Sequence, residues 1–203
     1  LNAEQLDEIE KFGRYLDVDG DGICYRTYPG THPTKGSFFT RGTSRDRYAI
    51  YSEQGDVYVD NVDRLNQKFD TAATLVPPAI VAQAKKANKA GLIYYGTTSA
   101  AIQETLDLLA DKGIKVDTMR IRAFPFGAEV EQFIDDHDTL FVIEQNRDGQ
   151  LRTLLINELE VNPKKLAKVL HYDGLPITAR FISTQVAEKL AGTPAKKSTQ
   201  KVG

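Results

Sequence analysis

Three aspartates stand at alternate positions, Asp17, Asp19 and Asp21, and Gly22 follows the last of them. Carboxylates at positions one, three and five, with glycine at six, form the first half of an EF-hand calcium loop. Position twelve would be Tyr28, where such a loop needs a bidentate glutamate. The pattern is therefore not a complete EF-hand. It predicts either a looser Ca²⁺ or Mg²⁺ site that another segment completes, or a plain Asp/Gly turn.

Arg41 lies between Thr40 and Thr43 in a loop-rich part of the chain. A planar guanidinium flanked by hydroxyls suits bidentate recognition of a carboxylate. Thr40, Arg41 and Thr43 are therefore candidate substrate-binding residues. The alternative is ordinary loop chemistry, in which the charged residues 45–47 form surface ion pairs.

Three further loops follow three apolar runs that resemble strands. They are Gly-Thr-Thr-Ser at 96–99, Phe-Pro-Phe at 124–126 and Glu-Gln-Asn-Arg-Asp-Gly-Gln at 144–150. The carboxyl ends of parallel strands meet at one sheet edge, where open α/β sheets hold their binding sites. Free N–H groups at the start of the next helix favour an anion or partner carbonyls there. The candidate residues for an anion or an interface are Thr97, Thr98, Ser99, Asn146, Gly149 and Gln150.

The alternative is a purely structural role, in which these loops cap helices and pack against another domain or subunit. Two neighbouring aromatics at 124–126 favour packing against a partner. The loops also lack a G-x-G-x-x-G fingerprint and a Walker lysine. Both alternatives stay open on the sequence alone.

The sequence contains no motif that would form a complete set of catalytic residues. The three histidines share no ligand spacing, no serine has the G-x-S-x-G context, and Cys24 is the one cysteine. A single thiol excludes an intrachain disulfide, a Cys-rich zinc site and an iron–sulfur cluster held by this chain's own thiolates. We therefore expect no catalytic residue and no cofactor held by this chain alone, and we expect a cytoplasmic location.

Composition points to a globular protein. The chain has 203 residues, of which 41% are hydrophobic and 27% charged, and its formal net charge is −2. No apolar run reaches the roughly 18 residues of a membrane span, and the charge gives no case for nucleic acid. We expect no membrane and no nucleic-acid partner. Because the chain starts with Leu1 and its one methionine is Met119, we expect it not to be a complete reading frame.

The first part of the chain is rich in turns and poor in apolar residues. Up to about residue 60, only residues 48–51 read as a strand. A helix follows over roughly 57–74, with Val62, Leu65 and Phe69 on one face, and two prolines close it. This segment is too poor in apolar residues to bury a core of its own, so we expect it to pack against another domain.

From residue 91 the pattern is regular and predicts α/β architecture. Strands are expected at about 91–96, 114–123, 140–144 and 177–181. Helices are expected after an N-cap at Ser99, over 128–136 and from 149 on, with a further helical turn at 166–170. Strands separated by helices imply crossovers, hence a mainly parallel, doubly wound sheet with helices on both faces.

Several ordered motifs resemble the alpha subunit of 2-oxoglutarate (2-oxoacid):ferredoxin oxidoreductase, in its C-terminal portion. They are Asp-Val-Asp-Gly-Asp-Gly-Ile at 17–23, Tyr-Arg-Thr at 25–27, Pro-Gly-Thr-His-Pro at 29–33, Phe-Thr-Arg-Gly-Thr at 39–43, Phe-Pro-Phe at 124–126 and Glu-Gln-Asn-Arg-Asp-Gly-Gln-Leu at 144–151. The resemblance covers roughly residues 10 to 185. One departure is Arg45, where relatives often carry a histidine.

The resemblance implies a domain plan. Residues 1–84 would be a loop-rich remnant of a pyrimidine-binding domain with its connecting helix. Residues 85–191 would resemble the transketolase C-terminal domain, and 192–203 would be a tail. The segment that contacts the thiamine pyrimidine in the family is absent from these residues.

The resemblance also implies a reaction, the oxidative decarboxylation of 2-oxoglutarate to succinyl-CoA with ferredoxin as electron acceptor. Thiamine diphosphate, Mg²⁺ and a [4Fe-4S] cluster would act in the assembled enzyme, a dimer of heterodimers with a beta subunit. Ferredoxin and coenzyme A would be partners, and this segment alone would be inactive. The competing hypothesis is a stand-alone anion-binding or regulatory module of doubly wound fold. An exposed apolar surface on residues 1–60 would favour the enzyme-subunit hypothesis.

Overall fold

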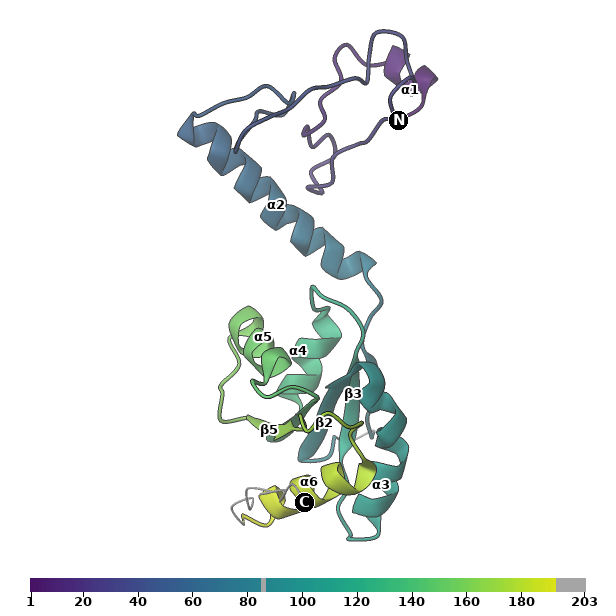
Figure 1. Ribbon diagram of the computed structural model, residues 1–203, viewed down its shortest axis with the longest axis vertical. Coiled ribbons are helices and arrows are strands. Elements are labelled where there is room, and N and C mark those ends of the chain that lie inside the picture. Colours follow the sequence, from purple (N-terminus) through teal and green to yellow (C-terminus); the bar gives the residue numbers. More distant parts are fainter. Residues whose placement is uncertain (85–86, 193–203) are drawn as a thin grey trace. The chain divides into compact units, whose positions relative to one another are not determined.

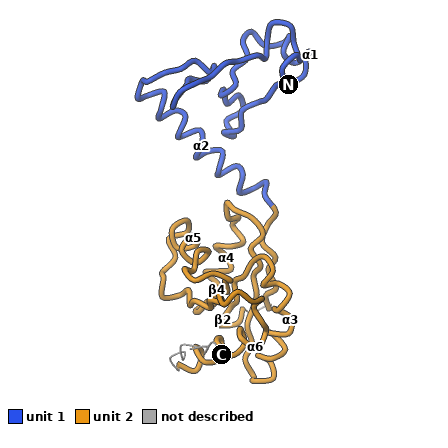
Figure 2. The backbone as a smooth tube through the Cα atoms, viewed as in Figure 1, with its two compact units in different colours: residues 1–76 blue, residues 77–203 orange. Residues whose placement is uncertain are grey.

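The structure is a computed structural model that describes residues 1–84 and 87–192 (Figure 1). The chain divides into two compact units, Leu1–Val76 and Pro77–Gly203 (Figure 2). We call them unit 1 and unit 2 and treat each by itself. Of the expected tail at 192–203, all but Gly192 lies outside the described residues.

Unit 1 consists of loops and two helices. The short helix α1 (Ala3–Asp7) begins with a capping box, in which Asn2 and Gln5 bond to each other's backbone N–H. The predicted helix is present as α2 (Gly55–Leu75) and ends before Pro77. The expected strand at 48–51 is wrong. Asp46 Oδ1 accepts the amides of Tyr48 and Ile50 (both 2.9 Å), which closes a turn in place of a strand.

Unit 2 contains a five-stranded, mainly parallel sheet, as the sequence predicted. Its strands are β1 (Ile80–Ala82), β2 (Ala90–Tyr95), β3 (Asp117–Ile121), β4 (Thr139–Glu144) and β5 (Leu166–Leu170). Their order is β1-β3-β2-β4-β5, and only the pairing of β1 with β3 is antiparallel. The core therefore lies on both sides of three buried central strands.

Helices cover both faces of this sheet (Figure 1). They are α3 (Ile102–Ala110), α4 (Ala128–Asp135), α5 (Gln150–Leu159) and α6 (Ala179–Leu190), and the 3-10 helix η1 (Gly96–Ala101) precedes α3. Side chains of β4 alternate between the faces: Val142 packs with α4 and α5, whereas Phe141 packs with α3 and α6. Among the described residues, no helix is both long and apolar enough to cross a membrane.

Two expectations near the end of the chain are wrong. Residues 166–170 form the strand β5 and not a helical turn, because Leu166 and Val169 are buried beside β4. Residues 177–181 are not a strand but lead into α6. There, Thr178 caps the helix by accepting the amide of Phe181 at 3.2 Å, and Ala179, Ile182 and Val186 form its buried face at helical spacing.

Two smaller differences concern β1 and Ser99. The edge strand β1 was not predicted: its apolar run is only three residues long, comes soon after two prolines and is exposed along its length. Ser99 does not cap a helix, since it lies inside η1 and its hydroxyl donates to the Gly96 carbonyl at 2.9 Å. The residue at the N-cap of α3 is Ala101.

Candidate functional site

At the carboxyl edge of the sheet in unit 2, the side chain of Gln145 connects the loop after β4 to two other segments. Its Nε2 donates to the hydroxyls of Thr97 (3.0 Å) and Thr98 (3.2 Å) in the loop after β2. Its Oε1 accepts the amide of Ile177, just before α6, at 3.3 Å. Three segments far apart in the sequence are thereby tied together directly after β4.

Glu144, the last residue of β4, is a buried carboxylate at the start of α5. Its side chain has no exposed surface (0%) and accepts the amides of Leu151 at 2.7 Å and Arg152 at 3.0 Å. It also accepts Asn146 Nδ2 at 2.8 Å. Burying an ionised carboxylate is costly unless donors surround it, and here helix amides supply them at the positive end of the helix dipole.

Asn146 completes the cap of α5. Its Oδ1 accepts the amides of Asp148 (3.1 Å), Gly149 (2.7 Å) and Gln150 (3.3 Å). Gly149 adopts φ 71°, a left-handed conformation that glycine reaches without strain. The amides that could receive an anion at this helix N-terminus are therefore bonded to the chain's own oxygens.

The loop after β2 uses its hydroxyls in the same way. Thr98 is 2% exposed, and Thr97 and Thr98 both accept hydrogen bonds from Gln145. Ser99 donates to its own loop. The hydrogen bonds of Thr97, Thr98 and Ser99 within the fold thus favour a structural role over anion binding, which stays a prediction.

Beside this polar cap lies an apolar groove of about 470 Å³. Phe124 and Phe126 form one wall, with ring centroids 5.3 Å apart in an edge-to-face arrangement, and the peptide between Phe124 and Pro125 is cis. The other lining residues are Tyr95, Gly96, Ile121, Arg122, Ala123, Gln150, Leu151 and Leu154. All three loops predicted from the sequence thus lie at one edge, and the apolar surface there is shaped to receive apolar groups.

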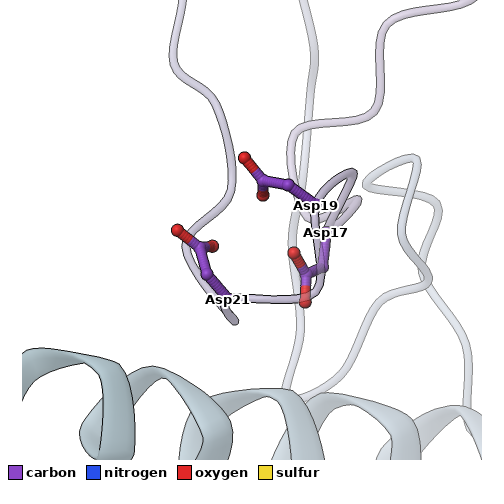
Figure 3. Close-up of side chains that lie close together, drawn as sticks. All are labelled: Asp17, Asp19 and Asp21. Atoms are coloured by element: carbon purple, nitrogen blue, oxygen red, sulfur yellow. The ribbon is translucent and has the colours of Figure 1, made fainter.

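In unit 1, the three aspartates gather around one turn of the loop that lies beside α2 (Figure 3). One ligand oxygen from each of Asp17, Asp19 and Asp21 lies within 4.8 Å of the others. The loop also uses these carboxylates internally: Asp17 accepts the amides of Gly20 and Gly22, each at 2.9 Å. A cation would have to compete with these donors, and metal binding stays a prediction.

The phenol of Tyr25 also engages this cluster. Its hydroxyl donates to Asp19 Oδ2 at 3.1 Å. This hydrogen bond to a carboxylate raises the pKa of the Tyr25 hydroxyl. The contact adds an aromatic donor to the loop that the spacing of the aspartates did not indicate.

Arg41 is exposed, and its guanidinium lies 5.8 Å from the ring centroid of Tyr51. Thr43 is exposed too, whereas the Thr40 hydroxyl is buried and has no hydrogen-bond partner among the described residues. The structure therefore presents Arg41 to solvent from a loop whose polar groups are incompletely satisfied. Its role in binding a carboxylate stays a prediction.

A buried polar network at the opposite edge of the sheet was not predicted. Asp117 is 3% exposed and His137 is 1% exposed, and their side chains meet at 3.1 Å. Burial alone would raise the pKa of Asp117. Hydrogen bonds from Asn88, Ala84 and His137 outweigh that effect and hold the pKa below its usual value. An aspartate that opens a buried strand is the one sequence signal that could have indicated this network.

The chain is similar in sequence to a curated protein. No protein-family model matches the chain. It is 25% identical over 169 residues to the alpha subunit of 2-oxoacid:ferredoxin oxidoreductase 2 of Aeropyrum pernix, covering 81% of this chain and 25% of that protein. This chain resembles an alpha subunit of the 2-oxoacid:ferredoxin oxidoreductases. It spans about a quarter of the length of this curated relative.

One solved structure shows the same fold over most of the chain. A 2-oxoglutarate:ferredoxin oxidoreductase from Magnetococcus marinus, solved with 2-oxoglutarate, coenzyme A and succinyl-CoA bound, aligns with a TM-score of 0.77 at 22% identity. The alignment covers 91% of this chain and 32% of that one. A split-gene transketolase (TM-score 0.47, 19% identity) covers 57% of this chain and 44% of its own. The resemblance to the oxidoreductase alpha subunit and the α/β fold were both predicted from the sequence, and both are confirmed.

Proposed function

We propose that this chain is the C-terminal portion of the alpha subunit of a 2-oxoacid:ferredoxin oxidoreductase. In this proposal, residues 1–84 end a pyrimidine-binding domain and residues 85–191 form the transketolase C-terminal-like domain. The chain supplies an assembly interface and substrate-side loops. The enzyme oxidatively decarboxylates 2-oxoglutarate to succinyl-CoA and passes the electrons to ferredoxin.

The observation that carries this proposal is the uncovered apolar surface of unit 1. Leu6 and Ala49 are the buried apolar residues among its 76, all of which the structure describes. Large apolar side chains stand exposed throughout the first 60 residues: Val18, Tyr25, Tyr28, Phe38, Phe39, Ile50, Tyr51, Tyr58 and Val59. A unit with so little buried apolar area cannot offset its own conformational entropy, so this surface belongs against other polypeptide.

Buried polar atoms in unit 1 support the same conclusion. Thr27 Oγ1, Thr40 Oγ1, Arg45 Nε and Arg64 Nε are buried without a hydrogen-bond partner among the described residues. Native structures contain few such atoms, because each costs about 1 to 3 kcal/mol. Their clustering in one unit is expected where further donors and acceptors come from a neighbouring chain or domain.

Cofactors and partners follow from the proposal. Thiamine diphosphate, Mg²⁺ and the [4Fe-4S] cluster would be held outside this chain, since Cys24 alone cannot supply the thiolates of a cluster. The partners would be the beta subunit, ferredoxin and coenzyme A, in a cytoplasmic dimer of heterodimers. Thiamine diphosphate would act as the electron sink for decarboxylation, while this chain would contribute surface and loops.

The stand-alone anion-binding module is the weaker hypothesis. The amides at the start of α5 are bonded to Glu144 and Asn146, and the hydroxyls of Thr97 and Thr98 are bonded to Gln145. An incoming anion would have to displace these contacts. The exposed apolar surface of unit 1 has no role in such a module.

Reconstitution tests the proposed function. The chain is combined with the remaining polypeptide of the enzyme, including its cysteine-rich beta subunit, and reduction of ferredoxin is followed with 2-oxoglutarate and coenzyme A. We expect stable copurification and turnover only in the assembly. Isothermal titration calorimetry should show no tight binding of thiamine diphosphate to the chain alone. Tight binding there, or a chain that stays monomeric and inactive with its partners, would contradict the proposal.

Arg41→Ala tests the substrate-side loop within the assembled enzyme. If Arg41 holds the distal carboxylate of 2-oxoglutarate, its loss removes a charged hydrogen bond of about 1.5 to 3 kcal/mol. The Michaelis constant for 2-oxoglutarate should then rise roughly 10- to 100-fold. Pyruvate has no distal carboxylate and should be affected much less, and the exposed Arg26→Ala should change neither. Equal losses for both substrates would make Arg41 structural.

A further inference from the structure

The positions of the protons in the buried pair of Asp117 and His137 follow from the hydrogen bonds around it. Asp117 Oδ1 accepts the Ala84 amide at 3.1 Å and Asn88 Nδ2 at 2.7 Å, and Asp117 Oδ2 accepts the Asn88 amide at 2.7 Å. Burial raises the pKa of Asp117, but the hydrogen bonds lower it by more, so the carboxyl group is ionised at neutral pH. Asp117 is therefore a buried carboxylate that can only accept hydrogen bonds.

His137 faces an acceptor with each of its ring nitrogens. Nδ1 lies 2.6 Å from the Phe133 carbonyl oxygen, and Nε2 lies 3.1 Å from Asp117 Oδ2. Neither oxygen can donate, and the His137 side chain has no exposed surface (0%) through which water could reach it. A neutral imidazole has a single N–H, so it would leave one nitrogen lone pair against an acceptor oxygen. The imidazolium, with two N–H groups, satisfies both contacts.

The other charged groups around His137 do not oppose a positive ring. Asp136, the adjacent residue, has an electrostatic interaction with His137, and its carboxylate also accepts Gln83 and Gln132. Three of the charged residues in the described segments next to the ring are acidic and three are basic, which leaves the buried Asp117 as the deciding charge. They are Lys89, Lys115, Asp135, Asp136, Asp138 and Lys165, of which all but the half-buried Lys165 are exposed.

We propose that His137 and Asp117 form a buried imidazolium–carboxylate pair that makes the amino edge of the sheet in unit 2 sensitive to pH. Asp117 opens β3, and the two residues whose amides it accepts, Ala84 and Asn88, lie between β1 and β2. The pair therefore connects the end of α4 to the start of β3 and to the chain that enters β2. The proposal rests on contacts within unit 2 and does not depend on the proposed enzymatic function.

The pair is complete between an alkaline and an acidic limit. An unfolded histidine loses its second proton near about pH 6.5, whereas His137 keeps it to higher pH because both of its nitrogens donate. The stabilisation from His137 is therefore fully present below that pH and is lost as the pH rises and the folded ring releases its proton. Asp117 sets the acidic limit, because its lowered pKa keeps the carboxylate charged until the pH falls well below neutral.

NMR of the histidine rings tests the proposal on the isotope-labelled full chain. Long-range proton–nitrogen spectra distinguish protonated from unprotonated ring nitrogens, and the contact with the Phe133 ring, whose centroid is 4.2 Å away, assigns His137. His171 is the control, because one nitrogen, Nε2, faces both of its acceptors, the Leu175 carbonyl at 3.1 Å and the Asp173 carboxylate at 3.0 Å. At about pH 7.5 we expect two protonated nitrogens in His137 and one in His171.

Replacing the carboxylate separates a charged pair from a merely structural contact. Asp117→Asn nearly keeps the shape, and its amide can donate to Nε2, so His137 should become a neutral ring with its proton on Nδ1. Asp136→Asn is the matched control, since it removes an exposed carboxylate next to His137 and should leave both ring nitrogens protonated. A role in packing alone would leave the protonation of His137 unchanged in both variants.

Hydrogen exchange of the unaltered chain gives a second measurement that needs no variant. Rates are corrected for the intrinsic effect of pH. The Asn88 amide, which donates to Asp117, should lose about tenfold or more of its protection as the pH rises and His137 loses its proton. The Leu151 amide, which donates to the buried Glu144 at 2.7 Å, should not change over the same range.

Three outcomes would overturn the proposal. The first is a folded chain in which His137 has one unprotonated nitrogen at about pH 7.5. The second is a His137 ring that keeps both protons in Asp117→Asn. The third is an equal change of protection at Asn88 and Leu151, because that result would mean that the pair does not control the amino edge of the sheet.

Discussion

Replacing Glu144 with glutamine removes a buried charge from the cap of α5 while nearly keeping its shape. The carboxylate accepts the amides of Leu151 (2.7 Å) and Arg152 (3.0 Å) and Asn146 Nδ2 (2.8 Å). Glutamine has one acceptor oxygen, so its amide group must face at least one of these donors. A hydrogen bond to a charged group contributes about 1.5 to 3 kcal/mol, and the helix dipole adds roughly 0.3 to 1 kcal/mol. We therefore expect unit 2 to lose about 2 to 4 kcal/mol of unfolding free energy.

Urea denaturation followed by far-ultraviolet circular dichroism measures this loss. Asp148→Asn is the matched control, since it removes a carboxylate from the same loop. That side chain pairs with Arg147 at 2.7 Å, and both members of the pair are more than half exposed (75% and 56%). Such a pair contributes at most about 1 kcal/mol. If Glu144→Gln cost no more than Asp148→Asn, Glu144 would not be the residue that holds the loop, and its charge would be free for a ligand.

Three further predictions concern other sites. Hydrogen bonds hold the pKa of Asp117 below its usual value. The Asp117 carboxylate therefore stabilises the folded state fully above roughly pH 5, and this stabilisation is lost as the pH falls through the lowered pKa of the folded state. Asp117→Asn should therefore reduce the unfolding free energy by about 2 to 4 kcal/mol at pH 7 and less at pH 3, and a pH-independent difference would contradict this. Gly22→Ala should release the aspartate loop from α2, because a Cβ there would lie 2.3 Å from the Lys68 amide, whereas at Gly20 it would meet nothing within 4 Å. Hydrogen exchange of the loop should rise much more for Gly22→Ala than for Gly20→Ala, and equal rates would refute the contact. Burial raises the pKa of the Cys24 thiol, so alkylation near neutral pH should be slower than for an unfolded peptide containing it, and an equal or faster rate would contradict this.

Strands with a simple apolar pattern were predictable from the sequence. The central strands β2 and β4 are buried on both faces, so their residues form continuous apolar runs that local pattern reveals. The edge strands gave a weaker signal, since the apolar run of β1 is only three residues long. Strand β1 is fully exposed, and β5 carries Lys168 at an exposed position between buried residues, which reads equally well as a helical turn. Edge strands are defined by pairing, and pairing is not a local property.

The position of the candidate site was predictable, but its internal contacts were not. Three loops at strand carboxyl ends had to share one edge once the sheet was parallel. The sequence could not show that Gln145 joins Thr97, Thr98 and Ile177, since these residues lie far from it along the chain. The buried pair of Asp117 and His137 was missed for the same reason: the two residues belong to different elements.

The two units differ in how their polar groups are used, and this bears on where function resides. In unit 2 the side chains of Glu144, Gln145 and Asn146 form hydrogen bonds with other residues of the same unit. These residues therefore hold the edge of the sheet in place without a ligand. Unit 1 contains both buried polar atoms without partners among the described residues and many exposed apolar side chains. A surface that is incomplete in both respects gains most from association, because a partner can cover its apolar area and supply the missing hydrogen bonds at once. Binding should therefore concentrate on unit 1.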